Sequence, residues 1–158
     1  MKKIIMLCAA MVAIMMMASC SKEKTSEYNE HAFTEQQQKV LDLFHGSWRN
    51  GTGDCFWDFH EQSDTNVVVY EDDYVNGPRE KYQYQGIVSY RVMNMNGVDT
   101  AQYFTYHYYV SRDASYVNMY FISSGSRADK YDLQVPDATH FKFRSSYSSI
   151  WLTYEKVQ

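Results

Sequence analysis

The apolar residues of this chain follow first the period of a helix and then the period of a strand. A helix pattern covers roughly residues 35–45 and opens at Thr34, where Gln37 stands three residues on as in a capping box. Gly46 supplies a C-terminal stop. The apolar positions of this segment are Val40, Leu41 and Phe44. One helix of about three turns cannot bury itself, so its apolar side is expected to cover another element.

From Gly46 onward the period changes to two, which is typical of strands. After the opening Gly46-Ser47-Trp48, the strand-like runs are residues 55–59, 66–71, 81–92, 102–110, 116–122, 141–143 and 150–157. Short connections such as Asn96-Gly97 separate them, and Gly86 inside the longest run indicates a bend or bulge. Several runs carry tyrosine on their second face, which suits a closed barrel with a partly polar interior. The pattern predicts an all-β fold: a single antiparallel up-and-down barrel of about eight strands, with one short N-terminal helix.

The first twenty residues have the parts of a secretory signal. Lys2 and Lys3 precede an uncharged run rich in Met, Ala and Ile, which ends at Met17-Ala18-Ser19-Cys20. This run is shorter than the roughly 20 residues that a membrane-spanning helix needs. A cysteine directly after small residues resembles a lipoprotein signal, so acylation of Cys20 is expected. A cleaved signal without lipid and a short anchor are the alternatives.

This interpretation divides the chain into three parts. Residues 1–19 form the signal peptide, residues 20–33 a lipidated flexible tether, and residues 34–158 the barrel domain. The expected location is the bacterial cell envelope, with a lipid anchor in the membrane and the outer membrane preferred over the inner.

Composition excludes several classes of function. The formal net charge is −4 and no cluster of Lys and Arg occurs, so nucleic acid is not an expected partner. The five histidines show no metal-ligand spacing, and no phosphate loop or nucleophile elbow is present. We therefore expect no metal, no cofactor and no enzymatic activity.

Cys55 is the single cysteine of the predicted barrel domain. A nucleophilic or redox thiol needs a neighbouring base or cation, and Asp54-Cys55-Phe56-Trp57 supplies neither. A buried small hydrophobic side chain is the favoured interpretation.

The order of these elements resembles that of the lipocalins. A lipocalin carries Gly-x-Trp at the start of its first strand, where Gly46 and Trp48 stand here. It also carries an Arg on the last strand, packed over that Trp; Lys156 is the nearest residue to this pattern, and Arg144 is the other candidate. Asp113-Ala114-Ser115-Tyr116 loosely matches a further lipocalin pattern.

Residues 34–158 are more closely similar to the small lipocalin-like lipoproteins of Gram-negative gut anaerobes. The shared features are the lipidation signal, a spacer, Gly-x-Trp and a closing Tyr154-Glu155-Lys156-Val157. The resemblance implies that Gly46, Trp48 and Lys156 close one end of the barrel. The helix is expected to cover that end against Trp48, with a mouth at the other end.

Aromatic side chains provide the candidate binding residues, since tyrosine combines an apolar ring with a polar tip. They are Trp57, Tyr103, Tyr109, Tyr116 and Tyr120. Rings that only fill the core are the alternative interpretation. Separately, Asp99-Thr100-Ala101 resembles the O-glycosylation signal of such bacteria, which makes Thr100 a candidate for modification.

Two functions follow from this interpretation. The first is a membrane-anchored protein that holds a small hydrophobic or amphiphilic ligand in the barrel. The second is an envelope interaction protein that binds a glycan or another protein, such as a protease that it inhibits, through surface aromatics.

Overall fold

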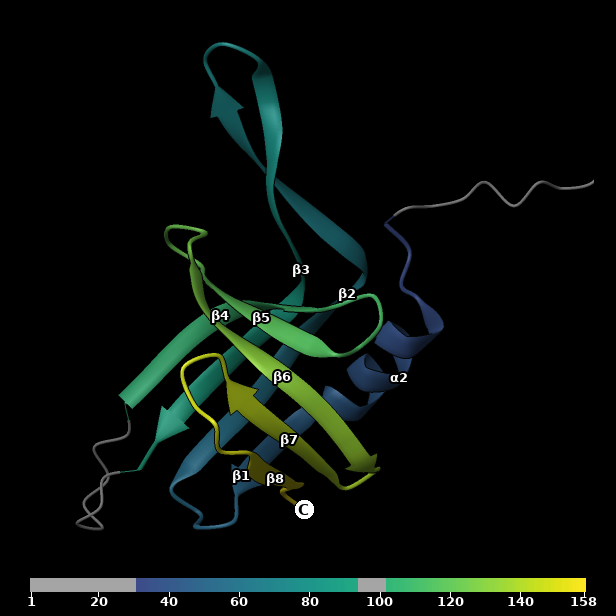
Figure 1. The fold of residues 1–158 in the computed structure, drawn as a ribbon, viewed down its shortest axis with the longest axis vertical. Coiled ribbons are helices and arrows are strands. Elements are labelled where there is room, and N and C mark those ends of the chain that lie inside the picture. The colour runs from purple at the N-terminus through teal and green to yellow at the C-terminus, as the bar shows by residue number, and fades with distance from the viewer. Residues whose placement is uncertain (1–30, 94–101) are drawn as a thin grey trace, which may run out of the picture. The chain divides into compact units, whose positions relative to one another are not determined.

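The computed structural model describes residues 31–93 and 102–158. In this part of the chain one helix, α2 (Glu35–Phe44), precedes eight strands. The strands are β1 (Gly46–Asn50), β2 (Cys55–Asp73), β3 (Gly77–Val92), β4 (Gln102–Val110), β5 (Tyr116–Phe121), β6 (Arg127–Asp137), β7 (His140–Ser145) and β8 (Leu152–Lys156). Each pairs antiparallel with the next, and β8 pairs with β1 to close the barrel (Figure 1). The predicted fold class is confirmed. Cys20, Asn96-Gly97 and Thr100 lie outside the described residues.

Helix α2 starts with the predicted capping box. The Gln37 backbone N–H donates to Thr34 Oγ1 at 3.1 Å, and the Thr34 N–H donates to Gln37 Oε1 at 2.9 Å. The helix ends at Phe44, and Gly46 then adopts a φ of 103°, which glycine tolerates without steric cost. Its apolar residues Leu41 and Phe44 are fully buried in the barrel core. The expectation that the helix covers another element is therefore confirmed.

The core is largely aromatic at the end of the barrel that the helix covers. Phe44 of the helix stacks on Phe59 at 4.3 Å between ring centroids and meets Phe141 at 5.2 Å. The indole N–H of Trp48 donates to the Phe44 carbonyl at 3.2 Å, so a polar atom of this core has a partner. Because the inward positions alternate along each strand, this one cluster joins residues from all eight strands.

Two strands differ from the sequence prediction. Residues 55–59 and 66–71 belong to one long strand, β2, which is interrupted by register shifts after Phe59 and Gln62. Strand β6 was not predicted because Leu133 is its only buried residue, so its sequence lacks a hydrophobic alternation. The expected number of strands is nevertheless correct.

Strands β2 and β3 extend past the other strands as a two-stranded arm, defined here as residues 67–84. These residues pair only with each other, from Val67 opposite Tyr84 to Asp73 opposite Gly77. Figure 1 shows the arm projecting from the barrel. The arm begins where Gly86 pairs with both Gln62 and Tyr108. The bend or bulge that Gly86 predicted therefore lies where β3 stops pairing with β4 and continues into the arm.

Residues 31–158 form one compact unit, and every strand pair of the barrel lies within it. A fragment of residues 31–158 therefore carries the complete hydrogen-bonded barrel and its core.

Candidate functional site

The three residues of the barrel-closing motif lie together. Trp48 and Lys156 are directly opposite each other in the β1–β8 pair, and Lys156 Nζ lies 5.5 Å from the centre of the Trp48 ring. Gly46 lies beside this lysine, since a Cβ at that position would be in ordinary contact with Lys156 Cε at 3.8 Å. Arg144 instead bonds Asp132 at 2.6 Å, so Lys156 is the basic residue that covers the tryptophan.

Surface hollows lie beside this closed end. One, of about 450 Å³, is lined by Thr139, His140, Glu155, Lys156, Val157 and Gln158. A second, of about 350 Å³, is lined by Lys39, Asp42, Leu43, Val135, Asp137, Ala138 and Lys156. No core residue contributes to either hollow, so both lie outside the barrel.

The opposite end of the barrel opens progressively toward solvent. Along β4, the inward positions change from Val110 and Tyr108, at 0% and 2% exposure, to half-buried Tyr106 and then Phe104 at 43%. Along β5 they change from buried Met119 to Phe121 at 42% exposure. Inward-facing aromatic rings are therefore accessible at this end, which we call the mouth.

Neighbouring strands contribute further inward side chains to the mouth. Tyr90 lies opposite Trp57 on β2 and opposite Phe104 on β4, and opposed residues of an antiparallel pair share a face. Tyr131 lies opposite Val117 and packs against the core. Below them, Trp57 forms a floor, with ring centroids 4.4 Å from Tyr90 and 5.6 Å from Tyr131. We define the mouth cluster as Trp57, Tyr90, Phe104, Tyr106, Phe121 and Tyr131.

One carboxylate belongs to the same surface. Asp129 lies opposite Met119, which faces the core, and accepts hydrogen bonds from the hydroxyls of Ser145 at 2.6 Å and Ser146 at 2.9 Å. Burial, followed by the negative charge of Asp129, raises the pKa of both Tyr131 and Tyr106. The phenols therefore stay neutral and can donate a hydrogen bond to a polar group in the mouth.

Cys55 lies near the mouth but is not activated. The Tyr90 hydroxyl donates to Cys55 Sγ at 3.3 Å. Burial raises the pKa of the thiol, the Tyr90 hydrogen bond lowers it, and the Asp54 charge raises it further, with a net increase. A protonated thiol is a poor nucleophile. Cys55 is half-buried, not buried as the sequence predicted.

Of the five predicted ligand-binding aromatics, only Trp57 faces the interior. The other four lie on the outer face of β4 and β5: Tyr103, Tyr109, Tyr116 and Tyr120. Tyr103 is 64% exposed, whereas the remaining three are half-buried. A ligand held inside the barrel would not meet these four rings.

The base of the arm covers part of this outer tyrosine surface. Tyr82 stacks on Tyr120 at 4.4 Å, and Tyr84 stacks on His107 at 3.9 Å. Tyr82 also shares a hydrogen bond of 2.9 Å with His107 Nδ1. The outer aromatics therefore form a second packed layer, which attaches the arm to the barrel.

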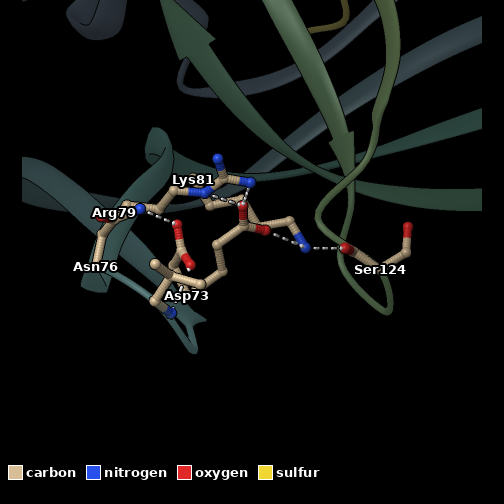
Figure 2. Close-up of polar contacts among 7 residues, drawn as sticks. Asp73, Asn76, Arg79, Lys81 and Ser124 are labelled. Atoms are coloured by element: carbon tan, nitrogen blue, oxygen red, sulfur yellow. Dashed lines mark hydrogen bonds and ion pairs between the residues drawn. The ribbon is translucent and has the colours of Figure 1, made fainter.

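The tip of the arm presents apolar side chains to solvent. Tyr74 and Val75 are 104% and 87% exposed. The turn is fixed because Asp73 accepts hydrogen bonds from the Val75 N–H at 3.0 Å and from the Asn76 side chain at 3.1 Å (Figure 2). These same bonds lower the pKa of the Asp73 carboxyl.

A polar chain connects the arm to the loop between β5 and β6. Arg79 Nε donates to Glu71 at 2.6 Å, and Lys81 lies 3.8 Å from the other oxygen of that carboxylate. Lys81 Nζ also donates to the Ser124 carbonyl at 2.7 Å (Figure 2). These contacts hold the arm against the loop between β5 and β6.

Five mouth residues were not among the binding residues predicted from the sequence: Tyr90, Phe104, Tyr106, Phe121 and Tyr131. The period of two along a strand could have identified them. On β4, for example, Phe104 and Tyr106 lie an even number of residues from Val110, which is in the core. Tyrosine on both faces of β4 obscured this series.

Two further properties concern only the described part of the chain. Within residues 31–93 and 102–158, no group of three or more His, Cys, Asp or Glu side chains is arranged to hold a metal ion. In the same residues, no helix has the length and apolar character that crossing a bilayer requires.

Comparison of the whole chain with known protein families, curated proteins and solved structures found no match.

Proposed function

We propose that this protein is a membrane-anchored binding protein that holds a small hydrophobic or amphiphilic molecule at the mouth of its barrel. The observation that carries the proposal is the exposure of inward-facing rings, with Phe104 and Phe121 at 43% and 42%. Isolated exposed apolar side chains are ordinary, but a contiguous aromatic set around one opening is typical of a ligand site.

The packing beneath the mouth sets the depth of this site. Trp57 meets Tyr131 and Phe143, and the rings below them fill the barrel down to the helix. The ligand would therefore rest on the exposed rings above Trp57, which is itself only 2% exposed, instead of entering a deep cavity. Burial of each methylene group contributes about 0.8 kcal/mol, so a short alkyl chain supplies useful affinity.

The proposed setting is the bacterial cell envelope, at the outer membrane. Acylation of Cys20 would hold the domain beside a lipid surface, where amphiphilic molecules are concentrated. The similarity to lipocalin-like lipoproteins supports this setting through the sequence Met17-Ala18-Ser19-Cys20. A lipid anchor and an aromatic mouth suit the same task of carrying molecules with an apolar part.

Native mass spectrometry tests the proposal. The full chain carrying Cys20→Ser is purified from its own host, and its native mass is compared with its denatured mass. We expect a co-purifying small molecule that is lost on denaturation. The matched control is Phe104→Ser with Phe121→Ser, which removes two exposed rings of the mouth and should lower the loaded fraction. A bare protein whose tryptophan emission does not respond to a panel of amphiphiles would contradict the proposal.

The arm supports a second candidate, an interaction protein of the envelope that binds a protein or glycan. Its specific observation is the pair Tyr74 and Val75, fully exposed on a turn fixed by Asp73. Preorganised aromatic side chains are frequent interface anchors, and a protruding turn fits the cleft of an enzyme such as a protease.

Site-specific photo-crosslinking in the host tests this candidate. A crosslinker at position 74 should give one discrete adduct, and a crosslinker at the exposed position 64, on the β2 side of the arm base, is the control. Adducts at neither position, or equally at both, would count against a partner at the tip.

A further inference from the structure

We infer that Asp129 selects a cationic amphiphile, an organic ammonium group joined to an apolar chain, as the ligand of the mouth. This inference rests on the proposed function and specifies the chemical class of its ligand. It follows from the position of Asp129, from the charges around it and from the rings beside it.

The position of Asp129 is fixed from three directions. Its Oδ2 accepts from Ser145 Oγ at 2.6 Å, while Oδ1 accepts from Ser146 Oγ at 2.9 Å and from the Lys130 backbone N–H at 2.7 Å. Its partner in the β5–β6 pair is Met119, a core residue, so the carboxylate lies on the inward face. The Tyr131 hydroxyl is also hydrogen-bonded to Asp129. All four of these partners are neutral, so none of them compensates the negative charge of the carboxylate.

No basic side chain of the described residues forms an ion pair with this carboxylate. The nearest basic residues of β6 are used on the outer face: Lys130 lies 4.2 Å from the centre of the Tyr116 ring, and Arg127 lies opposite Tyr120. On the neighbouring strand β7, Arg144 bonds Asp132. The negative charge of Asp129 is therefore uncompensated on the side that faces the mouth.

The rings around Asp129 favour a cation as well. Tyr106 and Tyr131 are close enough that the Asp129 charge raises the pKa of each, after the larger effect of burial. Phe121 lies 5.5 Å from Tyr106 between ring centroids and continues the aromatic surface to the rim. The faces of aromatic rings attract organic cations, and sets of such rings recognise quaternary ammonium groups.

The two ends of the ligand are thereby assigned. The ammonium group would lie between Asp129 and the rings of Tyr106 and Tyr131, with the apolar chain over the half-buried Tyr90. A fatty acid would place its carboxylate beside Asp129 and be repelled. The site therefore discriminates by charge among molecules with the same apolar chain.

Three probes with the same chain separate charge from apolar binding: octyltrimethylammonium, octanol and octanoate. They are titrated into residues 31–158, with tryptophan emission as the signal and Trp57→Phe as the control for its origin. We expect the cation to bind about tenfold more tightly than octanol, and octanoate to bind least.

Asp129→Asn keeps the shape but removes the charge. Its Oδ1 can still accept from Ser146 and the Lys130 N–H, while the Ser145 hydroxyl would accept from the new amide N–H instead of donating. This variant should bring the three affinities within about twofold of each other while the octanol affinity stays unchanged. Asp64→Asn changes the net charge equally at an exposed position and should leave the preference intact.

The outcomes separate the two proposals. Equal binding of all three probes to the parent protein would overturn the inference about charge and leave the binding function standing. A cation preference that survives Asp129→Asn would also overturn it. Binding of none of the probes would overturn both.

Discussion

Gln85 and Val110 are paired as two strand residues would be, although one contributes only its side chain. The Val110 N–H donates to Gln85 Oε1 at 2.8 Å, and Gln85 Nε2 donates to the Val110 carbonyl at 3.1 Å. Backbone pairing between β3 and β4 ends at Gly86 and Tyr108, so Val110 lies beyond the last backbone pair. The buried amide thus continues the ladder where the arm leaves the barrel.

Gln85→Met should therefore destabilise the domain. The substitution leaves the Val110 N–H without its acceptor and the side-chain Oδ1 of Asn66 without the Gln85 donor, while Gln37 still donates to the Val110 backbone carbonyl. Each unsatisfied buried group costs about 1–3 kcal/mol. Urea unfolding of residues 31–158 should show a loss of about 2–4 kcal/mol. Gln83→Met, which removes one exposed bond to Glu80, should change the free energy of unfolding by less than about 0.5 kcal/mol.

Gly86 allows the arm to leave the barrel because no side chain fits there. A Cβ at this position would lie 2.0 Å from the Glu61 carbonyl and 2.8 Å from the Tyr108 ring. Gly86→Ala should therefore cost at least about 1–3 kcal/mol of folding free energy. Gly51→Ala is the control, since nothing lies within 4 Å of its added Cβ. Equal unfolding midpoints for the two variants would argue against this account of the arm base.

His107 should make the domain less stable in mild acid. Burial lowers its pKa in the folded state, where its ring stacks on Tyr84 and its Nδ1 meets the Tyr82 hydroxyl. As the pH falls below about 6.5, the unfolded chain binds the proton first, so stability decreases until the folded histidine is protonated as well.

The measurement is the urea midpoint at about pH 7.5 and about pH 5.5, on either side of the ordinary histidine pKa. The decrease should be smaller in His107→Gln than in the parent domain. An identical decrease in both proteins would show that other groups cause the acid sensitivity.

Cys20→Ser should release the protein from the membrane. Acylation would add lipid mass at this residue, and a single chain plus a diacylglycerol-type anchor holds a protein firmly on a bilayer. Detergent-phase partitioning and intact mass of the full chain check the expectation. Cys55→Ser is the matched control and should leave both unchanged. Membrane retention of the Cys20 variant would refute anchoring through this cysteine.

The helix and the barrel could be predicted because their signals are local. Thr34 and Gln37 define the helix start by themselves, and alternation identifies most strands. Strand β6 could not be found this way, since its stability comes from pairing with β5 and β7 and only Leu133 is buried. The arm depends on where the pairing of β3 with β4 stops, at Gly86 and Tyr108, which composition does not encode.

The mouth could not be predicted for a different reason. Strand β4 carries aromatic rings on both faces, so alternation identifies two sets of residues without saying which set is inside. The arm makes the two sets harder to distinguish. Its Tyr82 and Tyr84 pack on the outer rings, so residues of the outer face are partly buried although they lie outside the barrel. Nothing in the sequence around Asp129 indicated that it faces inward; its pairing with Met119 in the structure shows this.

Photolabelling with an amphiphile would show directly whether the mouth of the barrel binds a ligand. An octanol analogue that carries a diazirine is irradiated with residues 31–158, and the labelled peptides are mapped by mass spectrometry. We expect labels on the inward residues of β3, β4 and β6, at or beside Tyr90, Tyr106 and Tyr131. Labels confined to the arm or to the outer tyrosines, or no saturable labelling, would contradict a ligand site at the mouth.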